Sequence, residues 1–424
     1  MVFVWNRNNC SGGFSVENHQ VQFGTKAVWA GEKDVLVHGA SQVPVIVSVA
    51  YTYEDMDHWY DVARGKKPGH IYGRNTNPTV QAFEEKVREL EGAEAATSFS
   101  TGMAAISNTL YTFLRPGDRV VTIKDTYGGT NKIFTEFLPE MGVEVVLCNT
   151  GNHEEMIAEV KKGCKILYLE SPTNPTVKIT DIERMAKTGK EAGALVVVDN
   201  TFATPVNQNP LQLGADLVIH SATKFLGGHA DALGGVVCGA KELVEKIYHY
   251  REINGATLDP WAAYLLLRGM KTLKLRVKQQ EKNAEAIARW LLKQELVEEV
   301  FYPGLETHVN HEIAKKQMRG FGGMLSFSLK GGMDAVRILL PKLKYANRAA
   351  NLGAVETTYG PARTTSHVEC TPEERKAVGI AEGLVRISAG IEDTEDLIAD
   401  LEQAFAHLKE QLEVSAAESG KAGS

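Results

Sequence analysis

Short runs of valine, isoleucine and leucine alternate with stretches of mixed polarity along the first half of the chain. The apolar runs have the length and composition of strands that are buried on both faces, and a stretch between them such as 180–192 has the pattern of a helix. Strands that alternate with helices predict a parallel sheet with helices on both faces. The predicted strands are 119–123, 143–148, 165–170, 194–199 and 216–221.

The C-terminal part of the chain has a different pattern. Apolar residues recur at helical spacing in 284–291 and again in 397–408, so both segments are predicted to be helices. Segments 324–332 and 384–390 are predicted to be strands. The pattern therefore indicates a smaller α+β domain after the larger α/β domain.

These patterns divide the chain into four parts. We expect an N-terminal arm over 1–75, a large domain over 76–265 and a small domain over 266–412. Residues 413–424 are small and polar, and we expect them to form a disordered tail.

Composition and charge narrow the classes of function. The 424 residues are 43% hydrophobic and 23% charged, as in a globular protein, and the net charge of −7 argues against a nucleic-acid or anionic-membrane partner. Five scattered cysteines without CxxC spacing favour a reduced compartment, and with no evident secretory signal or apolar membrane span we expect a cytoplasmic protein. His308 and His311 form an HxxH pair, but no third ligand lies nearby in the sequence, so no metal site is expected.

The residues with the clearest chemical potential follow the predicted strands, since the chemistry of such sheets gathers at the carboxyl ends of the strands. Lys224 comes shortly after strand 216–221, within "SATKFLGGHADALGGVV". Its apolar neighbours would desolvate the amine and lower its pKa, which suits a lysine that forms a Schiff base with an aldehyde. From this segment alone, a surface lysine at the start of a loop remains an alternative.

Two further strand ends carry an acid and an aromatic residue. Asp199 ends strand 194–199, where a carboxylate needs a cation or a donor, such as the protonated ring nitrogen of pyridoxal phosphate (PLP). A helix N-cap is the alternative. Tyr127 follows strand 119–123 and is placed to stack on a flat cofactor, although such a tyrosine alone is more often part of a core.

A fourth signal comes from "FSTGMAA" at 99–105, which places Thr101 and Gly102 just before an alanine-rich helix. Backbone N–H groups at a helix start, with hydroxyls beside them, form an anion site. The phosphate site, the aromatic ring, the acid and the lysine therefore share one edge of one sheet. This combination predicts PLP bound to Lys224.

Longer motifs extend this reading. "SATKFLGGHADALGGVV", "YGRNTNPTVQAFEEKVRELEGAE", "ESPTNP" and "VVVDNTFATP" resemble the Cys/Met-metabolism family of PLP-dependent enzymes, over about residues 22–410. That family includes cystathionine γ-synthase and γ-lyase, methionine γ-lyase and O-acylhomoserine sulfhydrylases. The resemblance implies PLP fold-type I, an aspartate-aminotransferase-like α/β large domain with a mostly parallel sheet and a smaller C-terminal α+β domain. It also implies a homotetramer built from two dimers.

The resemblance gives each cofactor residue a role. Lys224 would carry the cofactor and move protons, and Tyr127 would stack on the ring and help to deprotonate the substrate amine. Asp199 would pair with the ring nitrogen. The other cofactor contacts that it implies are Thr101, Gly102, Met103, Thr201, Ser221 and Thr223.

The resemblance also implies contacts outside this cofactor pocket. Tyr72 and Arg74, on the N-terminal arm, would reach the phosphate bound by the neighbouring subunit. Arg386 would hold the substrate α-carboxylate as a bidentate fork. The other expected substrate-binding residues are Asn174, Asn351 and Ser366.

The reaction subtype is less sharply specified. Asn351 before "LGAVE", and "TTSH" at 364–367, look like O-acylhomoserine sulfhydrylases, although those enzymes usually have lysine where this chain has Glu356. Gly129 stands where methionine γ-lyases tend to have cysteine, and Arg363 is unexpected near a substrate mouth. We therefore expect γ-replacement on O-acetyl- or O-succinylhomoserine by a thiol or another nucleophile. The alternative is a γ-lyase acting on cystathionine, methionine, canavanine or a related amino acid, and a remote alternative is a PLP-binding protein without catalysis.

Overall fold

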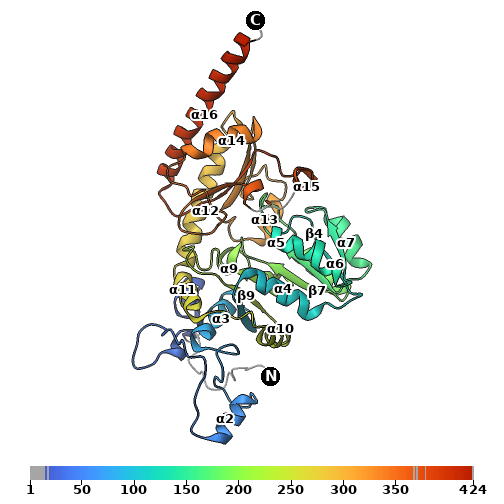
Figure 1. Ribbon diagram of the computed structural model, residues 1–424, viewed down its shortest axis with the longest axis vertical. Helices are drawn as coiled ribbons and strands as arrows, with labels where there is room; N and C mark the ends of the chain where they lie inside the picture. The colour runs from blue at the N-terminus through green and yellow to red at the C-terminus, as the bar shows by residue number, and fades with distance from the viewer. Residues whose placement is uncertain (1–14, 17–18, 366–367, 369–370, 378, 423–424) are drawn as a thin grey trace.

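The computed structural model describes residues 15–16, 19–365, 368, 371–377 and 379–422. Figure 1 shows an elongated molecule in which a seven-stranded sheet lies in the middle and a four-stranded sheet lies above it. Within the described part of the chain, no helix combines the length and the apolar character needed to cross a bilayer.

The large sheet has the strand order β3-β9-β8-β7-β6-β4-β5. Every pair from β8 to β5 is parallel, which confirms the predicted α/β class with a mostly parallel sheet. Strand β9 runs antiparallel to both β3 and β8, a reversal that the sequence pattern did not predict. The strands are β3 (Ala95–Phe99), β4 (Arg119–Ile123), β5 (Glu144–Cys148), β6 (Ile166–Glu170), β7 (Leu195–Asp199), β8 (Leu217–Ser221) and β9 (Gly235–Gly239).

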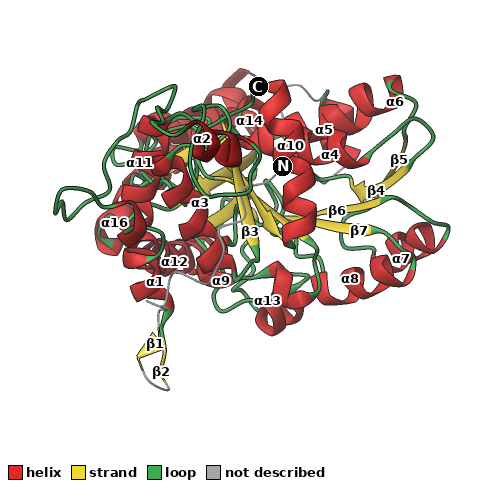
Figure 2. Ribbon diagram, turned by 90° about the horizontal axis from the view of Figure 1, so that it is seen from below, coloured by secondary structure: helices red, strands yellow, loops and turns green. Residues whose placement is uncertain are grey.

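Helices cover both faces of this sheet, as Figure 2 shows. Ile166 and Tyr168 of β6 pack toward α4 and α10, whereas Leu167 and Leu169 pack toward α7 and α8. Successive strand residues point to opposite faces, so both sets are buried and the run is apolar throughout. The covering helices are α3 (Pro78–Glu91), α4 (Gly102–Phe113), α7 (His153–Lys161), α8 (Ile182–Glu191) and α10 (Lys241–Asn254).

Part of the N-terminal segment extends away from the body, whereas α1 packs against α3 and α12. In Figure 1, α2 lies at the lower end of the molecule, opposite the C-terminal end of α16. The predicted arm over 1–75 falls in this region. Its elements are β1 (Ser15–Val16), β2 (His19–Gln20), α1 (Phe23–Trp29) and α2 (Met56–Ala63).

The small sheet is antiparallel, with the order β10-β11-β13-β12. Helices α12, α14 and α16 pack on it and enclose a separate hydrophobic core. The elements are β10 (Val297–Phe301), β11 (Met324–Leu329), β12 (Thr358–Pro361), β13 (Leu384–Ser388), α12 (Leu273–Leu291), α14 (Gly332–Leu339) and α16 (Thr394–Ala422). Shorter helices are α5 (Gly128–Lys132), α6 (Leu138–Glu140), α9 (Thr204–Asn207), α11 (Pro260–Met270), α13 (His311–Gln317) and α15 (Pro372–Ala377).

Helix α12 contributes to two cores. Leu273 and Val277, in its first half, pack with α3 and α11, whereas Ile287 and Leu291 pack under the small sheet. One rigid element therefore connects the two sheets.

Helix α16 is longer than expected. It continues through Ala422, so the prediction of a disordered tail from residue 413 is wrong for 413–422. Leu408 anchors the helix in the core of the small sheet. Beyond it the sequence is rich in alanine, glutamate and lysine, which have high helix propensity and continue the helix.

Candidate active site

A cavity of about 230 Å³ lies at the carboxyl ends of β6, β7 and β8. One wall of the cavity is formed by Leu352, which precedes strand β12 in the sequence, and by Arg386, which lies on β13. Most of the residues expected from the sequence line it together. They are Thr101, Gly102, Met103, Tyr127, Asn174, Asp199, Thr201, Ser221, Thr223, Lys224 and Arg386.

Lys224 lies in the turn that follows β8, and its amine points into the cavity. Its Nζ lies 3.2 Å from Oδ1 of Asn351. Burial, assisted by the positive charge of Arg386, lowers the pKa of Lys224 to about 8. A useful fraction of the amine is therefore neutral near physiological pH, as attack on an aldehyde requires. This partly buried amine replaces the surface-lysine alternative.

The glycine-rich loop after Lys224 is shaped by a buried arginine of α12. Nη1 of Arg276 donates to the carbonyl oxygen of Phe225 at 2.8 Å, and Nη2 donates to that of Leu226 at 3.2 Å. A Cβ on Gly228 would lie 2.0 Å from Nη1 of Arg276, and its φ is +72°. Glycine is needed here because the loop folds directly over the guanidinium group.

The first turn of α4 forms an anion site. Oγ1 of Thr101 caps the helix by accepting the N–H of Ala104 at 3.0 Å. The N–H groups of Gly102 and Met103, among the orphan donors of the first turn, remain for a ligand. A Cβ on Gly102 would lie 2.7 Å from Oγ of Ser221, so glycine allows the helix start and the end of β8 to approach closely.

Asp199 lies on the floor of the cavity at the end of β7. Its Oδ1 accepts the N–H of Thr201 at 3.0 Å, and Oγ1 of Thr201 accepts the N–H of Ser221 at 2.9 Å. Burial raises the pKa of Asp199, while the hydrogen bonds from Thr201 and the charge of His220 lower it. A buried carboxylate in this position is suited to a protonated ring nitrogen.

Arg386 is buried on β13. Its Nη1 donates to Oδ1 of Asn174 at 3.1 Å, and its Nη2 donates to the carbonyl oxygen of Asn351 at 3.0 Å. Burial lowers its pKa to about 10. In the part of the chain that the structure describes, no carboxylate forms an ion pair with this guanidinium. The cation therefore suits a substrate carboxylate.

Further lining residues were assigned no binding role from the sequence, among them Glu170, Phe202, Leu233 and Thr365. The backbone N–H of Tyr127 donates to Oε2 of Glu170 at 2.9 Å. Glu170 ends β6 just as Asp199 ends β7, so its place at a strand terminus was the signal that could have revealed it.

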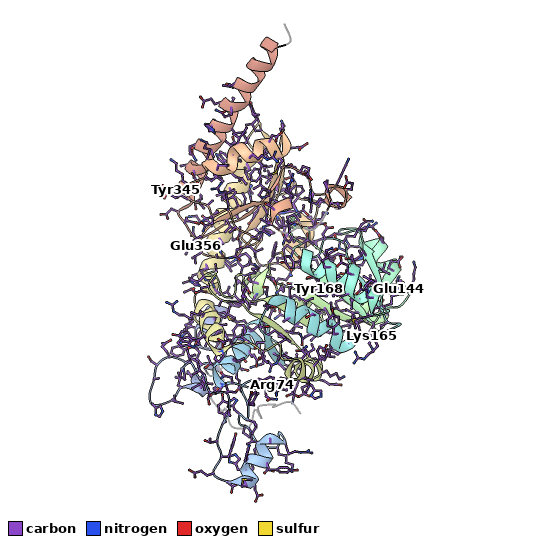
Figure 3. All side chains as sticks on the ribbon, viewed as in Figure 1. Arg74, Glu144, Lys165, Tyr168, Tyr345 and Glu356 are labelled. Carbon is purple, nitrogen blue, oxygen red and sulfur yellow. The ribbon has the colours of Figure 1, made fainter. Side chains whose placement is uncertain are left out.

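Tyr72 and Arg74 do not line this cavity. The Arg74 guanidinium stacks on the Tyr72 ring, 5.4 Å from the ring centroid, and donates to the carbonyl oxygen of Glu252. In Figure 3, Arg74 lies near the lower end of the molecule, well away from Glu356 beside the upper sheet. Their expected role toward a neighbouring subunit stays a prediction.

Arg363 and Ser366 were both considered in the sequence as residues near the substrate. Arg363 donates to Oε2 of Glu382 at 3.0 Å and does not line the cavity. Ser366 lies outside the described residues.

Comparison with known proteins identifies the family. The profile described as "Cys/Met metabolism PLP-dependent enzyme" matches residues 24–406. The chain belongs to this family. It is therefore related to PLP-dependent lyases and synthases. This confirms the predicted family, the PLP cofactor and the prediction that the protein is an enzyme, and it removes the alternative of a non-catalytic PLP-binding protein.

Named relatives span several reactions within the family. The chain is 46% identical to a cystathionine γ-lyase from Bacillus subtilis (strain 168), over 81% of this chain and 90% of that protein. It is 43% identical to an L-methionine γ-lyase from Fusobacterium nucleatum subsp. polymorphum, over 92% of this chain and 99% of that protein. A cystathionine γ-synthase from Xanthomonas oryzae pv. oryzae, solved with aminoacrylate and cysteine, superposes with a TM-score of 0.88 at 36% identity, covering 92% and 99% of the two chains.

The residues of the cavity fit PLP. The Lys224 amine suits the aldehyde, and the Asp199 carboxylate suits the ring nitrogen. The α4 start, narrowed by the close approach of Gly102 to Ser221, suits the phosphate, with the hydroxyl of Thr223 alongside.

Proposed function

We propose that the protein is a γ-lyase. It releases a small, uncharged group from Cγ of an L-α-amino acid and converts the remaining carbon skeleton to 2-oxobutanoate and ammonia. Water supplies the oxygen of the oxo group, and the leaving group takes a proton. PLP, when bound, supplies the electron sink for this chemistry.

The chain's own residues divide the task. Arg386 holds the α-carboxylate through two nitrogen atoms that Asn174 and the Asn351 carbonyl already orient. Lys224, with its lowered pKa, takes the proton from Cα and moves protons at Cβ and Cγ. Tyr127 lines the same cavity and would stack on the ring of the bound cofactor.

The observation that carries the proposal is the charge pattern of the cavity lining. Apart from Tyr127, its ionisable side chains among the described residues are Glu170, Asp199, Lys224 and Arg386. Each of them is assigned to the cofactor or to the α-carboxylate. The rest of the wall carries no formal charge and combines apolar residues with hydroxyl and amide side chains. Such a wall offers no counter-ion to a second carboxylate or ammonium group on the leaving side. The apolar lining residues are Met103, Ile106, Pro172, Phe202, Leu233, Ala350 and Leu352.

Elimination is favoured over replacement by the names of similar proteins, since the cystathionine γ-lyase and L-methionine γ-lyase relatives are both lyases. The second candidate is the γ-replacement expected from the sequence. Asn351, the residue that suggested it, contacts Lys224, and the Xanthomonas structural neighbour is a γ-synthase.

One substrate panel tests the choice. Methionine, O-acetylhomoserine, O-succinylhomoserine, cystathionine and canavanine are each incubated with the holoenzyme, with and without a thiol. We expect 2-oxobutanoate without thiol, fastest from substrates whose Cγ group is small and uncharged. Product that forms only with thiol, without 2-oxobutanoate, would overturn the lyase assignment in favour of replacement.

We also propose a homotetramer built from two dimers. Exposed aromatic residues on the N-terminal segment, including Trp29, Trp59 and Tyr60, support burial against another copy. Light scattering of the purified holoenzyme tests the state, and a monomer would contradict the proposal.

A further inference from the structure

Two carboxyl groups lie side by side under the cavity. Glu170 ends β6 and Asp199 ends β7, and the two residues are register partners in the parallel pair. Register partners in neighbouring strands project to the same face. Their exposed fractions are 5% and 8%, and both line the same cavity.

Glu170 also holds the backbone of Tyr127. Its Oε2 accepts the backbone N–H of Tyr127 at 2.9 Å, which connects the end of β6 to the loop after β4. Tyr127 is 44% exposed, so neighbouring side chains of this subunit enclose it only in part. The position of that ring therefore depends on how the backbone is held.

The surroundings of the two acids differ. Asp199 receives the Thr201 N–H at 3.0 Å and is near the charge of His220. Burial and the negative charges of Asp199 and Asp125 raise the pKa of Glu170, whereas backbone hydrogen bonds from Tyr127 and Asn174 lower it. Asp125 itself forms an ion pair with Lys178 at 2.7 Å. The other charged or titratable groups that line the cavity are Lys224 and Arg386, which stand at the amine and carboxylate positions, and Tyr127.

Two neighbouring buried carboxyl groups do not both ionise readily, because the negative charge of one raises the pKa of the other. Burial, followed by the charge of Asp199, raises the pKa of Glu170 well above its usual range. Burial raises the pKa of Asp199 as well, but the Thr201 hydrogen bonds and the charge of His220 lower it. A proton shared by the pair is therefore favoured on Glu170, with Asp199 as the anion.

We propose that Glu170 is a positioning residue that stays protonated beside Asp199 and, as a neutral acid, holds the Tyr127 loop against the cavity floor. In this arrangement the ring nitrogen meets a single anion, Asp199, and the stacking tyrosine is fixed by the same side chain. The inference rests on the cofactor of the family and is independent of the choice between elimination and replacement.

The experiment compares Glu170→Gln, Glu170→Ala and Asp199→Asn. Glutamine keeps the oxygen that accepts from Tyr127 and replaces the acid O–H by an N–H donor, so it imitates a protonated glutamate. We expect the PLP dissociation constant of Glu170→Gln within about threefold of wild type, and at least about tenfold weaker binding for Glu170→Ala and Asp199→Asn. Loss of PLP by Glu170→Gln as severe as that of Asp199→Asn would overturn the proposal.

The apoprotein supplies a readout that does not involve the cofactor. A carboxyl group whose pKa is raised on folding stabilises the protein less as the pH rises from its unfolded value through its folded value. Denaturant midpoints are therefore measured at pH 5.5 and 8.5, and wild type is expected to lose stability relative to Glu170→Gln at the higher pH. An equal difference at both pH values would contradict a proton on Glu170.

A third measurement needs no substitution. Wild-type apoprotein labelled with [¹³C]glutamate is examined by infrared spectroscopy at pH 7.5, where exposed glutamates are ionised. An isotope-shifted carboxylic acid C=O band supports the proposal, and the absence of such a band overturns it even when Glu170→Gln does not fold.

Discussion

The side-chain oxygen of Asn351 lies 3.2 Å from the amine nitrogen of Lys224, although 127 positions separate the two residues in the chain. The same residue turns its backbone oxygen toward Nη2 of Arg386 at 3.0 Å. The side chain of Asn351 therefore orients the amine, whereas its main chain orients the carboxylate clamp.

This division predicts the kinetics of Asn351→Ala. The substitution removes the amide that holds Lys224 but keeps the carbonyl that holds Arg386. We expect kcat to fall about tenfold because the proton-transferring amine is less well oriented, with KM for the amino acid nearly unchanged. Steady-state kinetics decides the point, and a large rise in KM at constant kcat would mean that the amide binds the substrate itself.

Arg386→Lys tests the clamp. Lysine carries the charge but has no planar fork to contact Asn174 and the Asn351 carbonyl together. We expect KM to rise at least about tenfold while PLP content, measured by absorbance, stays at the wild-type level. Loss of PLP from this variant would place Arg386 in cofactor binding instead.

Lys224→Met tests the cost of the buried amine in the apoprotein. The pKa falls from the ordinary 10.5 to about 8, so the charged form is penalised on folding. The penalty is complete below pH 8 and disappears as the pH rises through 10.5. The variant is therefore expected to be up to about 3 kcal/mol more stable at pH 7, with a smaller gain at pH 10.

The matched control for that measurement is Lys187→Met, because Lys187 is exposed on α8. Its stability change is expected to be small and the same at both pH values. Denaturant unfolding supplies the free energies. A pH-independent gain for Lys224→Met would refute the desolvation argument.

Mixing two inactive variants tests the role of Arg74 across subunits. If Arg74 completes the cofactor site that contains Lys224 of the neighbouring subunit, a dimer of one Arg74→Ala chain and one Lys224→Ala chain contains one intact site. Random reassortment of dimers then restores about a quarter of the sites. No recovery on mixing, with hybrid dimers demonstrated by mass, would show that Arg74 does not complete the partner's site.

Much of the site was predictable because parallel strands bring distant residues to one edge. The apolar runs located β4 to β8, and the residues after them, such as Asp199 and Lys224, converged as that geometry requires. The antiparallel direction of β9 was not predictable from its apolar run, since direction depends on the connection rather than on the pattern of the strand.

Contacts between residues far apart in the sequence were harder to predict. Asn351 was expected near the substrate, but its contact with Lys224 depends on how the small sheet packs against the large one. Arg363 was considered near the mouth of the substrate cavity, but it forms an ion pair with Glu382, which lies beside the same part of the small sheet. Such pairings arise from tertiary packing, which local sequence does not encode.

Helix α12 determines more than the packing of two cores. Besides Arg276, which holds the loop after Lys224, its Gln280 donates to the Ala354 carbonyl at 2.7 Å and its Asn283 donates to that of Gly390 at 3.0 Å. Helix α12 thus holds three segments in place, namely those that follow Lys224, Asn351 and Arg386. Incoming substrate meets a preassembled catalytic frame, so efforts to retune selectivity belong at the rim of the cavity and not along this helix.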